Sequence, residues 1–245
     1  MSGHSKWSTI KHKKAKTDAQ RGKIFSKMAR EITIASKIGG GDPTANTRLR
    51  LAIQKAKEVN MPNDNISRAI QKGAGGGEGA ALEEIMFEAY APNGVALIIE
   101  TLTDNRNRTI PNVKNPLTRV NGNLATKGAV SYMFDQKGLI IFAPDADEEH
   151  IMEIATEAGA EDIDKKDDGC IEVTTAPEDF ETVRQAFEDN EQRYEDASIT
   201  MIPQNLVQLT LEQSEKLTKL IDKLEEDDDV QNVYHNADFP DDFSY

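Results

Sequence analysis

The chain has 245 residues, of which 38% are hydrophobic, so it can form one or two domains with substantial cores. Its net charge of −14 is unevenly distributed, because residues 1–72 carry 16 lysines and arginines against 5 acidic residues and residues 73–245 carry 13 against 38. A single cysteine, Cys170, excludes an intrachain disulfide and a cysteine-based zinc site. No apolar run could cross a bilayer, and no signal peptide or arginine-rich presequence is recognisable, so we expect a soluble, cytoplasmic protein without membrane contact.

Residues 1–17, here called the basic arm, hold the densest positive charge and no acidic residue. They also hold the only tryptophan, which can stack on an unpaired base while the lysines bind phosphates. Because apolar residues are few, we expect the arm to become ordered only on a polyanion. The alternative is a solvated tail with Trp7 buried in a core. The candidate nucleic-acid-binding residues of the arm are His4, Lys6, Trp7, Lys11, His12, Lys13, Lys14 and Lys16.

A small three-helix bundle is predicted after the arm, because apolar residues recur at helical spacing. The first helix begins near Asp18 and ends at the glycines 39–41, the second follows Asp42-Pro43, and the third ends at Gly73. The first helix also carries basic residues that lie mainly off its apolar stripe and extend the candidate nucleic-acid-binding surface. They are Arg21, Lys23, Lys27 and Arg30.

Strands and helices alternate beyond a glycine-rich linker at residues 73–79, which lacks the lysine and the preceding strand of a phosphate-binding loop. The sequence predicts three strands, at residues 86–90, 95–102 and 130–134, with a helix between the second and the third strand. Residues 139–202 then follow the β-α-β-β-α-β order that is typical of ferredoxin-like domains. The remaining residues predict a strand near Leu206, a helix and a final strand at 230–234.

These elements predict an α+β multidomain protein with an N-terminal three-helix domain followed by two ferredoxin-like α+β domains, one inserted in the other. The expected domains are residues 1–74 for the basic arm and helices, residues 80–135 plus 204–245 for a discontinuous α+β domain, and residues 136–203 for the inserted domain. The inserted domain carries 5 lysines and arginines against 20 acidic residues.

Six short motifs stand out along the chain. They are Gly3-His-Ser-Lys-Trp7, Ile10-Lys-His-Lys13, Arg21-Gly-Lys-Ile-Phe-Ser-Lys27, Gly39-Gly-Gly-Asp-Pro43, Gly73-Ala-Gly75 and Thr103-Asp-Asn-Arg-Asn-Arg-Thr109. These motifs resemble those of the YebC/PmpR family, which includes the mitochondrial translational activator of cytochrome c oxidase. The resemblance covers the full length and implies one helical and two α+β domains. It also implies either a transcriptional regulator or a ribosome-associated factor that helps translation through difficult stretches such as consecutive prolines.

Two departures from the family pattern affect one helix and the turn after it. Asn121-Gly-Asn-Leu-Ala125 stands where the family usually reads Gly-Gly-Asn-Leu-Gly. Pro116 lies inside the preceding predicted helix, where the missing N–H and the ring are expected to kink it.

Arg106 and Arg108 lie at the predicted start of this same helix, directly after a strand. Cations there oppose the helix dipole, so two arginines together with the unpaired backbone amides could hold a phosphate. The alternative is that both arginines pair with nearby acidic residues while Asp104 caps the helix.

No catalytic or metal-binding pattern emerges, because the four histidines are scattered and no Ser/His/Asp or metal-ligand spacing is present. We therefore expect a non-enzymatic regulator without a cofactor. Ribosomal RNA is favoured over duplex DNA as its partner, because the helical domain is rich in lysines, which suit phosphates rather than base edges. The acidic α+β domains could contact basic ribosomal proteins.

Overall fold

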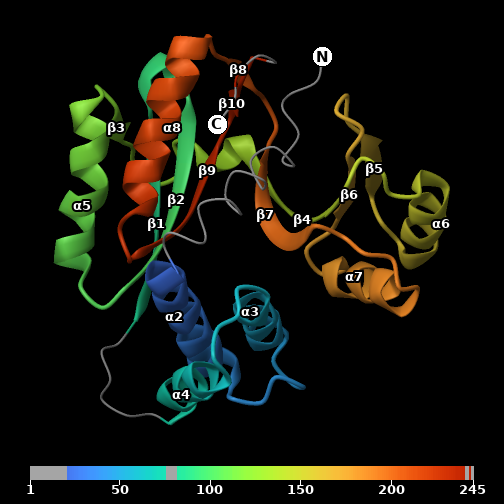
Figure 1. Ribbon diagram of the computed structural model, residues 1–245. Helices are drawn as coiled ribbons and strands as arrows, with labels where there is room; N and C mark the ends of the chain where they lie inside the picture. Colours follow the sequence, from blue (N-terminus) through green and yellow to red (C-terminus); the bar gives the residue numbers. More distant parts are fainter. Residues whose placement is uncertain (1–20, 76–81, 241–242, 244–245) are drawn as a thin grey trace.

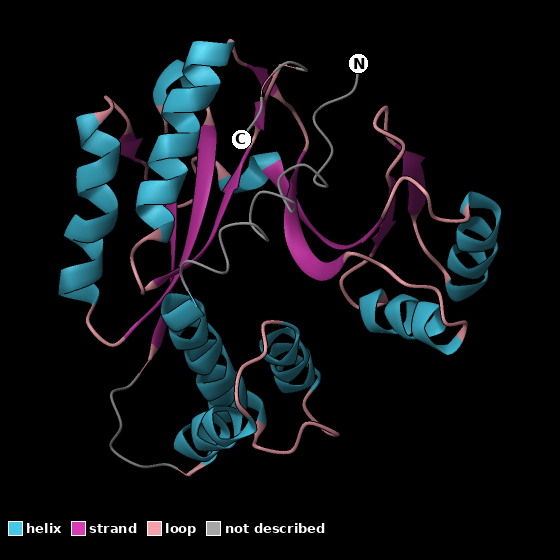
Figure 2. Cartoon of the chain, in the orientation of Figure 1, coloured by secondary structure: helices cyan, strands magenta, loops and turns pink. Residues whose placement is uncertain are grey.

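The computed structural model describes residues 21–75, 82–240 and 243, whose elements form three groups (Figure 1). A purely helical group lies at the bottom of Figure 2, and two groups that each contain a sheet lie above it. We call them the helical unit (residues 21–75), the discontinuous unit (residues 82–133 and 204–240) and the inserted unit (residues 134–203). The fold class is therefore α+β with an N-terminal helical unit, as the sequence predicted.

The helical unit is held together by the apolar stripes of its three helices, which are α2 (Arg21–Gly39), α3 (Thr47–Glu58) and α4 (Asn63–Ala74). Leu49 and Ile66 are buried in the shared core. The side chain of Asn46 accepts a hydrogen bond from the Leu49 N–H at 3.1 Å and donates to the Ala35 carbonyl at 2.8 Å, which fixes the corner between α2 and α3. The predicted helical start near Asp18 lies outside the described residues.

The discontinuous unit is an antiparallel sheet in the order β3-β1-β2-β9 with two helices on one face (Figure 1). Val113 and Leu117 from one helix and Leu217 and Leu224 from the other share one core with Leu97 of the sheet. A short parallel pair, β8 with β10, lies beside it. The elements are β1 (Glu83–Tyr90), β2 (Ala96–Thr103), α5 (Arg106–Arg119), β3 (Asn123–Leu124), β8 (Val207–Gln208), α8 (Leu211–Glu225), β9 (Val230–His235) and β10 (Ala237–Asp238).

The inserted unit has the predicted ferredoxin-like order, with an antiparallel sheet arranged β5-β6-β4-β7. Its core contains Phe142 of the sheet and Ile151, Phe180 and Phe187 of two helices. Its position between β3 and α8 shows that the first sheet is interrupted in sequence. The elements are β4 (Phe134–Phe142), α6 (Glu148–Ala158), β5 (Asp162–Lys165), β6 (Ile171–Thr175), α7 (Phe180–Asp189) and β7 (Asp196–Pro203).

The strand predicted at residues 130–134 is wrong in position. Ser131–Met133 form a 3-10 turn, and one continuous strand begins at Phe134 and includes the stretch predicted separately at 139–142. The cause is Glu88, whose buried carboxylate accepts hydrogen bonds from the backbone N–H groups of Gly128, Val130 and Ser131 at 2.6, 2.7 and 2.9 Å. These donors are therefore not available to a strand ladder.

The residues that depart from the family pattern are accommodated. Helix α5 includes both Pro111 and Pro116 and continues to Arg119, so neither proline ends it. Asn121 has φ of 63°, a left-handed conformation that asparagine tolerates better than most residues. Among the described residues, no helix combines the length and apolar character needed to span a membrane.

Candidate nucleic-acid interface

The predicted interface residues fall into an undescribed and a described set. The eight arm residues, from His4 to Lys16, lie outside the described residues, and Arg21 is described only as the first residue of α2. Lys23, Lys27 and Arg30 lie three and four residues apart on α2, so they share one side of the helix. Of the two arginines of α5, Arg108 meets Arg30 at a common carboxylate, whereas Arg106 does not.

Lys23 and Lys27 of α2 contact the C-terminal end of α8. Lys23 Nζ donates to the Glu226 carbonyl at 3.1 Å, and Lys27 Nζ donates to the Glu225 carbonyl at 2.7 Å. The last carbonyls of a helix have no partner within it and carry the negative end of its dipole. These lysines therefore help to attach the helical unit to the discontinuous unit.

Asp229 is the centre of a second attachment, because its almost fully buried carboxylate accepts hydrogen bonds from three different elements. Arg30 Nη1 of α2 donates to Oδ1, and Arg108 Nη2 of α5 donates to Oδ2 at 2.7 Å. The hydroxyls of Thr103 and Thr109 donate to the same oxygen at 3.1 and 2.9 Å. Burial opposes ionisation of Asp229, but these hydrogen bonds outweigh it and lower its pKa below the ordinary value.

Arg106 and Arg108 both face carboxylates of the chain. Arg108 Nη2 also donates to Asp104 Oδ1 at 2.9 Å, and Arg106 Nη1 donates to Glu83 Oε1 at 2.8 Å. This arrangement matches the acid-paired alternative, with one correction: Asn105 caps α5, because its side chain accepts from the Arg108 N–H at 3.1 Å. Phosphate binding by these arginines stays a prediction, and it would compete with these ion pairs.

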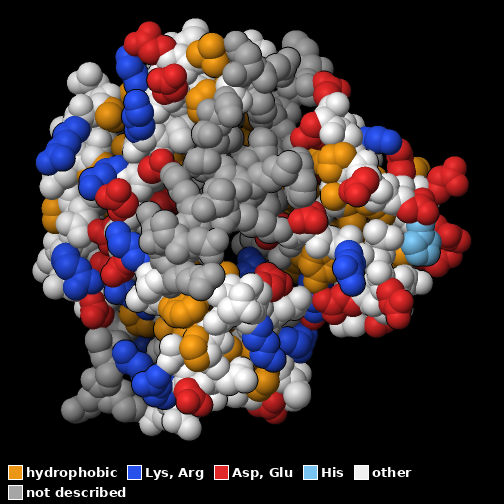
Figure 3. Space-filling view, in the orientation of Figure 1, with side chains coloured by type: hydrophobic (Ala, Val, Ile, Leu, Met, Phe, Trp, Pro, Cys, Tyr) orange, Lys and Arg blue, Asp and Glu red, His pale blue; other side chains and the backbone are white. Residues whose placement is uncertain are grey.

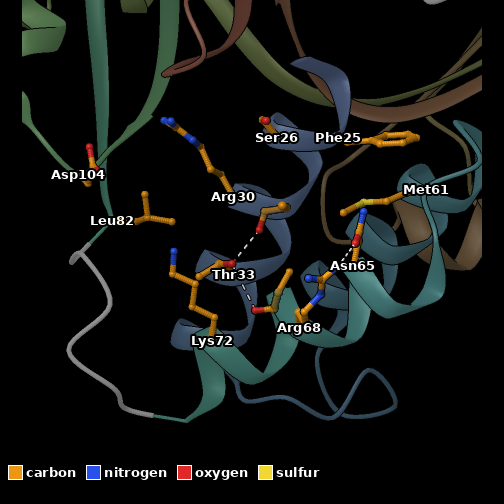
Figure 4. Close-up of a pocket in the computed structure, with 12 residues that line it drawn as sticks. Phe25, Ser26, Arg30, Thr33, Met61, Asn65, Arg68, Lys72, Leu82 and Asp104 are labelled. Carbon is orange, nitrogen blue, oxygen red and sulfur yellow. Dashed lines mark hydrogen bonds between the residues drawn. The ribbon is translucent and has the colours of Figure 1, made fainter. Parts of the chain in front are cut away.

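A groove of about 490 Å³ lies between α2 and α4 and reaches the start of β1 (Figure 4). Phe25 and Met61 line one end, and Arg30, Lys72 and Leu82 line the other. The remaining lining residues are Ser26, Ala29, Thr33, Asn65, Arg68, Ala69 and Asp104. The groove therefore combines apolar surface with positive charge.

Arg68 and Lys72 of α4 are the interface candidates that the sequence reasoning did not single out. Both are exposed, and neither has a carboxylate partner among the described residues. Arg30, Arg48 and Arg50 of the same unit, in contrast, all form ion pairs. The sequence contained a signal, because residues four apart on a helix share a face and this face lies off the apolar stripe of α4.

The helical unit also contacts the inserted unit, through α3 and α7. Arg50 Nε donates to Glu181 Oε1 at 3.1 Å, and Gln54 Nε2 donates to the Tyr194 hydroxyl at 3.2 Å. Buried Arg184 holds Glu181 in place with two hydrogen bonds, at 2.9 and 3.0 Å. A second cavity of about 790 Å³ lies along this contact.

The inserted and helical units differ in charge on the face of the molecule that Figure 3 shows. Figure 3 shows acidic side chains gathered over the inserted unit on the right, while lysines and arginines lie over the helical unit below. Within the described ranges, no group of three or more His, Cys, Asp or Glu side chains is placed to hold a metal ion. The arrangement of the described residues is therefore suited to binding an anion at the helical unit.

Comparisons with known proteins give one consistent result. Two family models match the chain, one for the "TACO1/YebC protein N-terminal domain" over residues 5–76 and one for the "TACO1/YebC second and third domain" over residues 82–237. A relative from Syntrophotalea carbinolica is 54% identical over 241 residues, which is 98% of this chain and 97% of the relative. A relative from Coxiella burnetii is 50% identical over 240 residues, which is 98% of each chain.

Both relatives carry the name "Probable transcriptional regulatory protein". Among solved structures, the crystal structure of a conserved hypothetical protein from Aquifex aeolicus is similar, with a TM-score of 0.84 and 46% sequence identity. The similarity covers 93% of this chain and 94% of that one.

Proposed function

The chain belongs to the TACO1/YebC family, whose relatives are named as regulators of gene expression, and on that premise we propose a non-enzymatic factor that binds RNA on the ribosome. Its role would be to relieve pausing at difficult sequences such as proline runs. The basic arm and the helical unit would supply the RNA contacts.

The observation that carries this proposal is the segregation of charge between the front of the chain and the rest. A positive region attracts phosphates even when the whole protein is acidic, because binding responds to the local field. Residues 1–72 have a surplus of lysines and arginines, and the described cations of α4 have no carboxylate partner among the described residues. The rest of the chain would repel a polyanion.

The division of labour that we propose follows the three expected domains. Residues 1–74 would bind the nucleic acid. Residues 80–135 plus 204–245 would hold that domain through Asp229 and the end of α8, and residues 136–203 would present an acidic surface to basic ribosomal proteins. A duplex running along the acidic inserted domain would be repelled, which favours RNA over duplex DNA.

The second candidate is a DNA-binding transcriptional regulator, and the names of the relatives favour it. The two candidates differ in what should change when the protein is absent. A ribosome-associated factor should alter ribosome positions while messenger levels stay largely constant. A transcriptional regulator should alter promoter occupancy and messenger levels.

The test replaces three lysines of the basic arm with glutamate, K11E/K13E/K14E, because each change turns phosphate attraction into repulsion. The control is K114E/K127E/K219E, which makes the same charge change at exposed positions outside the arm and helical unit. We expect ribosome profiling to show pausing with the arm variant, first at proline runs, and none with the control. Changed promoter occupancy and transcript levels without a shift in ribosome position would support the DNA-binding candidate instead.

A further inference from the structure

We propose that the groove between α2 and α4 holds one unstacked nucleotide of single-stranded RNA, with its phosphate at Arg68 and Lys72 and its base against Phe25 and Met61. This inference rests on the proposed function and names the part of the partner that the helical unit recognises. It adds a site in the described helical unit to the contacts expected from the basic arm.

The size and shape of the groove fit a ligand of this class. Its volume of about 490 Å³ lies within the range of about 300 to 1,000 Å³ that is usual for small-molecule sites. A base in the middle of a duplex is paired and stacked, so it cannot enter a concave site between two helices unless it is extruded. A single strand offers its bases without that cost.

One end of the groove can receive the base. Phe25 is partly buried and packs against the core of the helical unit, so its ring is held in place while part of it remains accessible. Met61 is buried, with 5% of its surface exposed, and forms apolar surface beside it (Figure 4). Stacking on an aromatic ring does not depend on base identity, because every base has a π-face.

The phosphate would be held by α4. Arg68 and Lys72 are four residues apart, which places them about 6 Å apart along the helix axis on one side. Arg68 is oriented by its own helix, because Nε donates to the Asp64 carbonyl at 3.2 Å and Nη2 donates to the Asn65 side-chain oxygen. An arginine has five N–H donors in a fixed fork, so others remain for an oxyanion.

The other charged residues of the groove explain why these two cations would do the binding. Arg30 is engaged by Asp229 and by the Leu102 carbonyl at 2.9 Å. Asp104 pairs with Arg108. Among the charged residues that line the groove, only Arg68 and Lys72 have no oppositely charged partner within the described residues. These two cations are therefore the ones that can bind a phosphate without first breaking an ion pair.

The position of the groove along the chain connects it to the basic arm. Phe25 lies on the second turn of α2, close behind the arm in sequence. The Phe25 end of the groove is therefore the end that lies nearer to the arm in sequence. This continuity favours a single strand bound by both regions.

The experiment measures binding of the full chain to a fluorescein-labelled single-stranded RNA, and to a labelled duplex DNA, by anisotropy. Contact of the base with the groove is measured by the change in fluorescence of a 2-aminopurine placed in the same RNA. Two variants alter the groove: R68A/K72A removes the cations that would bind the phosphate, and F25L removes the aromatic ring while keeping apolar packing. The control K114A/R119A removes the same charge from exposed positions on α5. Thermal unfolding of each variant verifies its fold.

We expect R68A/K72A to weaken RNA binding at least tenfold and to lower its salt dependence by about 0.7 in log–log slope for each phosphate that the variant no longer neutralises. F25L should reduce the change in 2-aminopurine fluorescence and weaken binding by about 5- to 150-fold. The control should bind like the wild type.

Three outcomes would overturn the inference. Groove variants that bind RNA like the control would show that the groove is not a site, although the proposed function would stand through the arm. Duplex DNA binding that is weakened in parallel, without any 2-aminopurine response, would show that α4 contacts a duplex backbone. A wild-type chain that binds no RNA would overturn both this inference and the proposed function.

Discussion

Replacing Asp229 with asparagine should weaken the attachment of the helical unit to the discontinuous unit. The carboxylate side chain is 2% exposed and balances Arg30 and Arg108, whose side chains are 24% and 45% exposed. Asparagine keeps the shape but offers one acceptor oxygen in place of two, and its NH₂ group would face the donors around it. Both arginines would lose their common negative partner.

The expected cost follows from the burial of these partners. Removing one member of a buried ion pair costs about 3 to 5 kcal/mol when the remaining charge stays buried. Here the arginines can regain water, so we expect about 2 to 3 kcal/mol. For a chain of this size that loss corresponds to a decrease in Tm of about 4 to 12 °C.

The assay is calorimetry of D229N beside D228N, which makes the same charge change at the exposed neighbouring residue. Hydrogen exchange should also accelerate in α2 of D229N, because Arg30 connects that helix to Asp229. Equal melting temperatures and equal exchange in α2 for the two variants would refute the structural role assigned to Asp229.

The difference in stability between the wild type and D229N should depend on pH, in a direction that follows from the pKa of Asp229. The pKa of Asp229 is lower in the folded chain than its ordinary value of 3.8. The carboxylate therefore stabilises the fold fully above the unfolded-state pKa, and this contribution is lost as the pH falls through the folded-state pKa. The stability difference between wild type and D229N should be constant near neutral pH and shrink below about pH 4.

Three further changes test other parts of the molecule. E88Q should lower the free energy of unfolding by about 1 to 3 kcal/mol in calorimetry, because glutamine has one acceptor oxygen for the three backbone N–H groups that Glu88 binds. E215Q, at an exposed position, should leave the stability unchanged. G73A should lower the free energy of unfolding in urea by about 1 to 3 kcal/mol, because the added Cβ would lie 2.2 Å from the Thr33 carbonyl oxygen. G22A is the control, because a Cβ at that position has no atom within 4 Å and should not destabilise the fold. RNA affinity should fall steeply with salt, by about 0.7 log units per contacted phosphate for each tenfold rise, and a flat response would point to protein contacts instead.

The spacing of apolar residues in the sequence predicted those helices and strands whose buried residues recur at regular intervals. The stripes of α2 to α4 and the β-α-β-β-α-β order of the inserted unit follow directly from such periods. The start of β4 was placed incorrectly because residues 130 and 131 are controlled by Glu88, more than forty residues earlier in the chain. A single sequence does not show which distant carboxylate will occupy a set of backbone donors.

The same limit applies to the candidate site. Arg30 and Arg108 are predicted phosphate ligands because they are cations near the basic arm or a helix start, and this stays a prediction. The sequence did not reveal their pairing with Asp229, which lies 199 and 121 residues away from them. Its role depends on tertiary contacts between three elements. Arg68 and Lys72, the further candidates that line the groove, did have a local signal in their helical spacing, but they lie far in sequence from the arm.

The structure divides the cations of the helical unit by what faces them. Lys23, Lys27 and Arg30 face the discontinuous unit, where helix-end carbonyls and a carboxylate already satisfy them, so a polyanion would have to displace these contacts to use them. Arg68 and Lys72 face the groove and have no such competitor among the described residues. Under the proposed function, the positive charge on α2 would therefore contribute mainly to holding the helical unit in place, and the positive charge on α4 and the arm would contribute to binding RNA. Loss of Arg30 should accordingly lower stability more than RNA affinity, and loss of Arg68 should do the opposite.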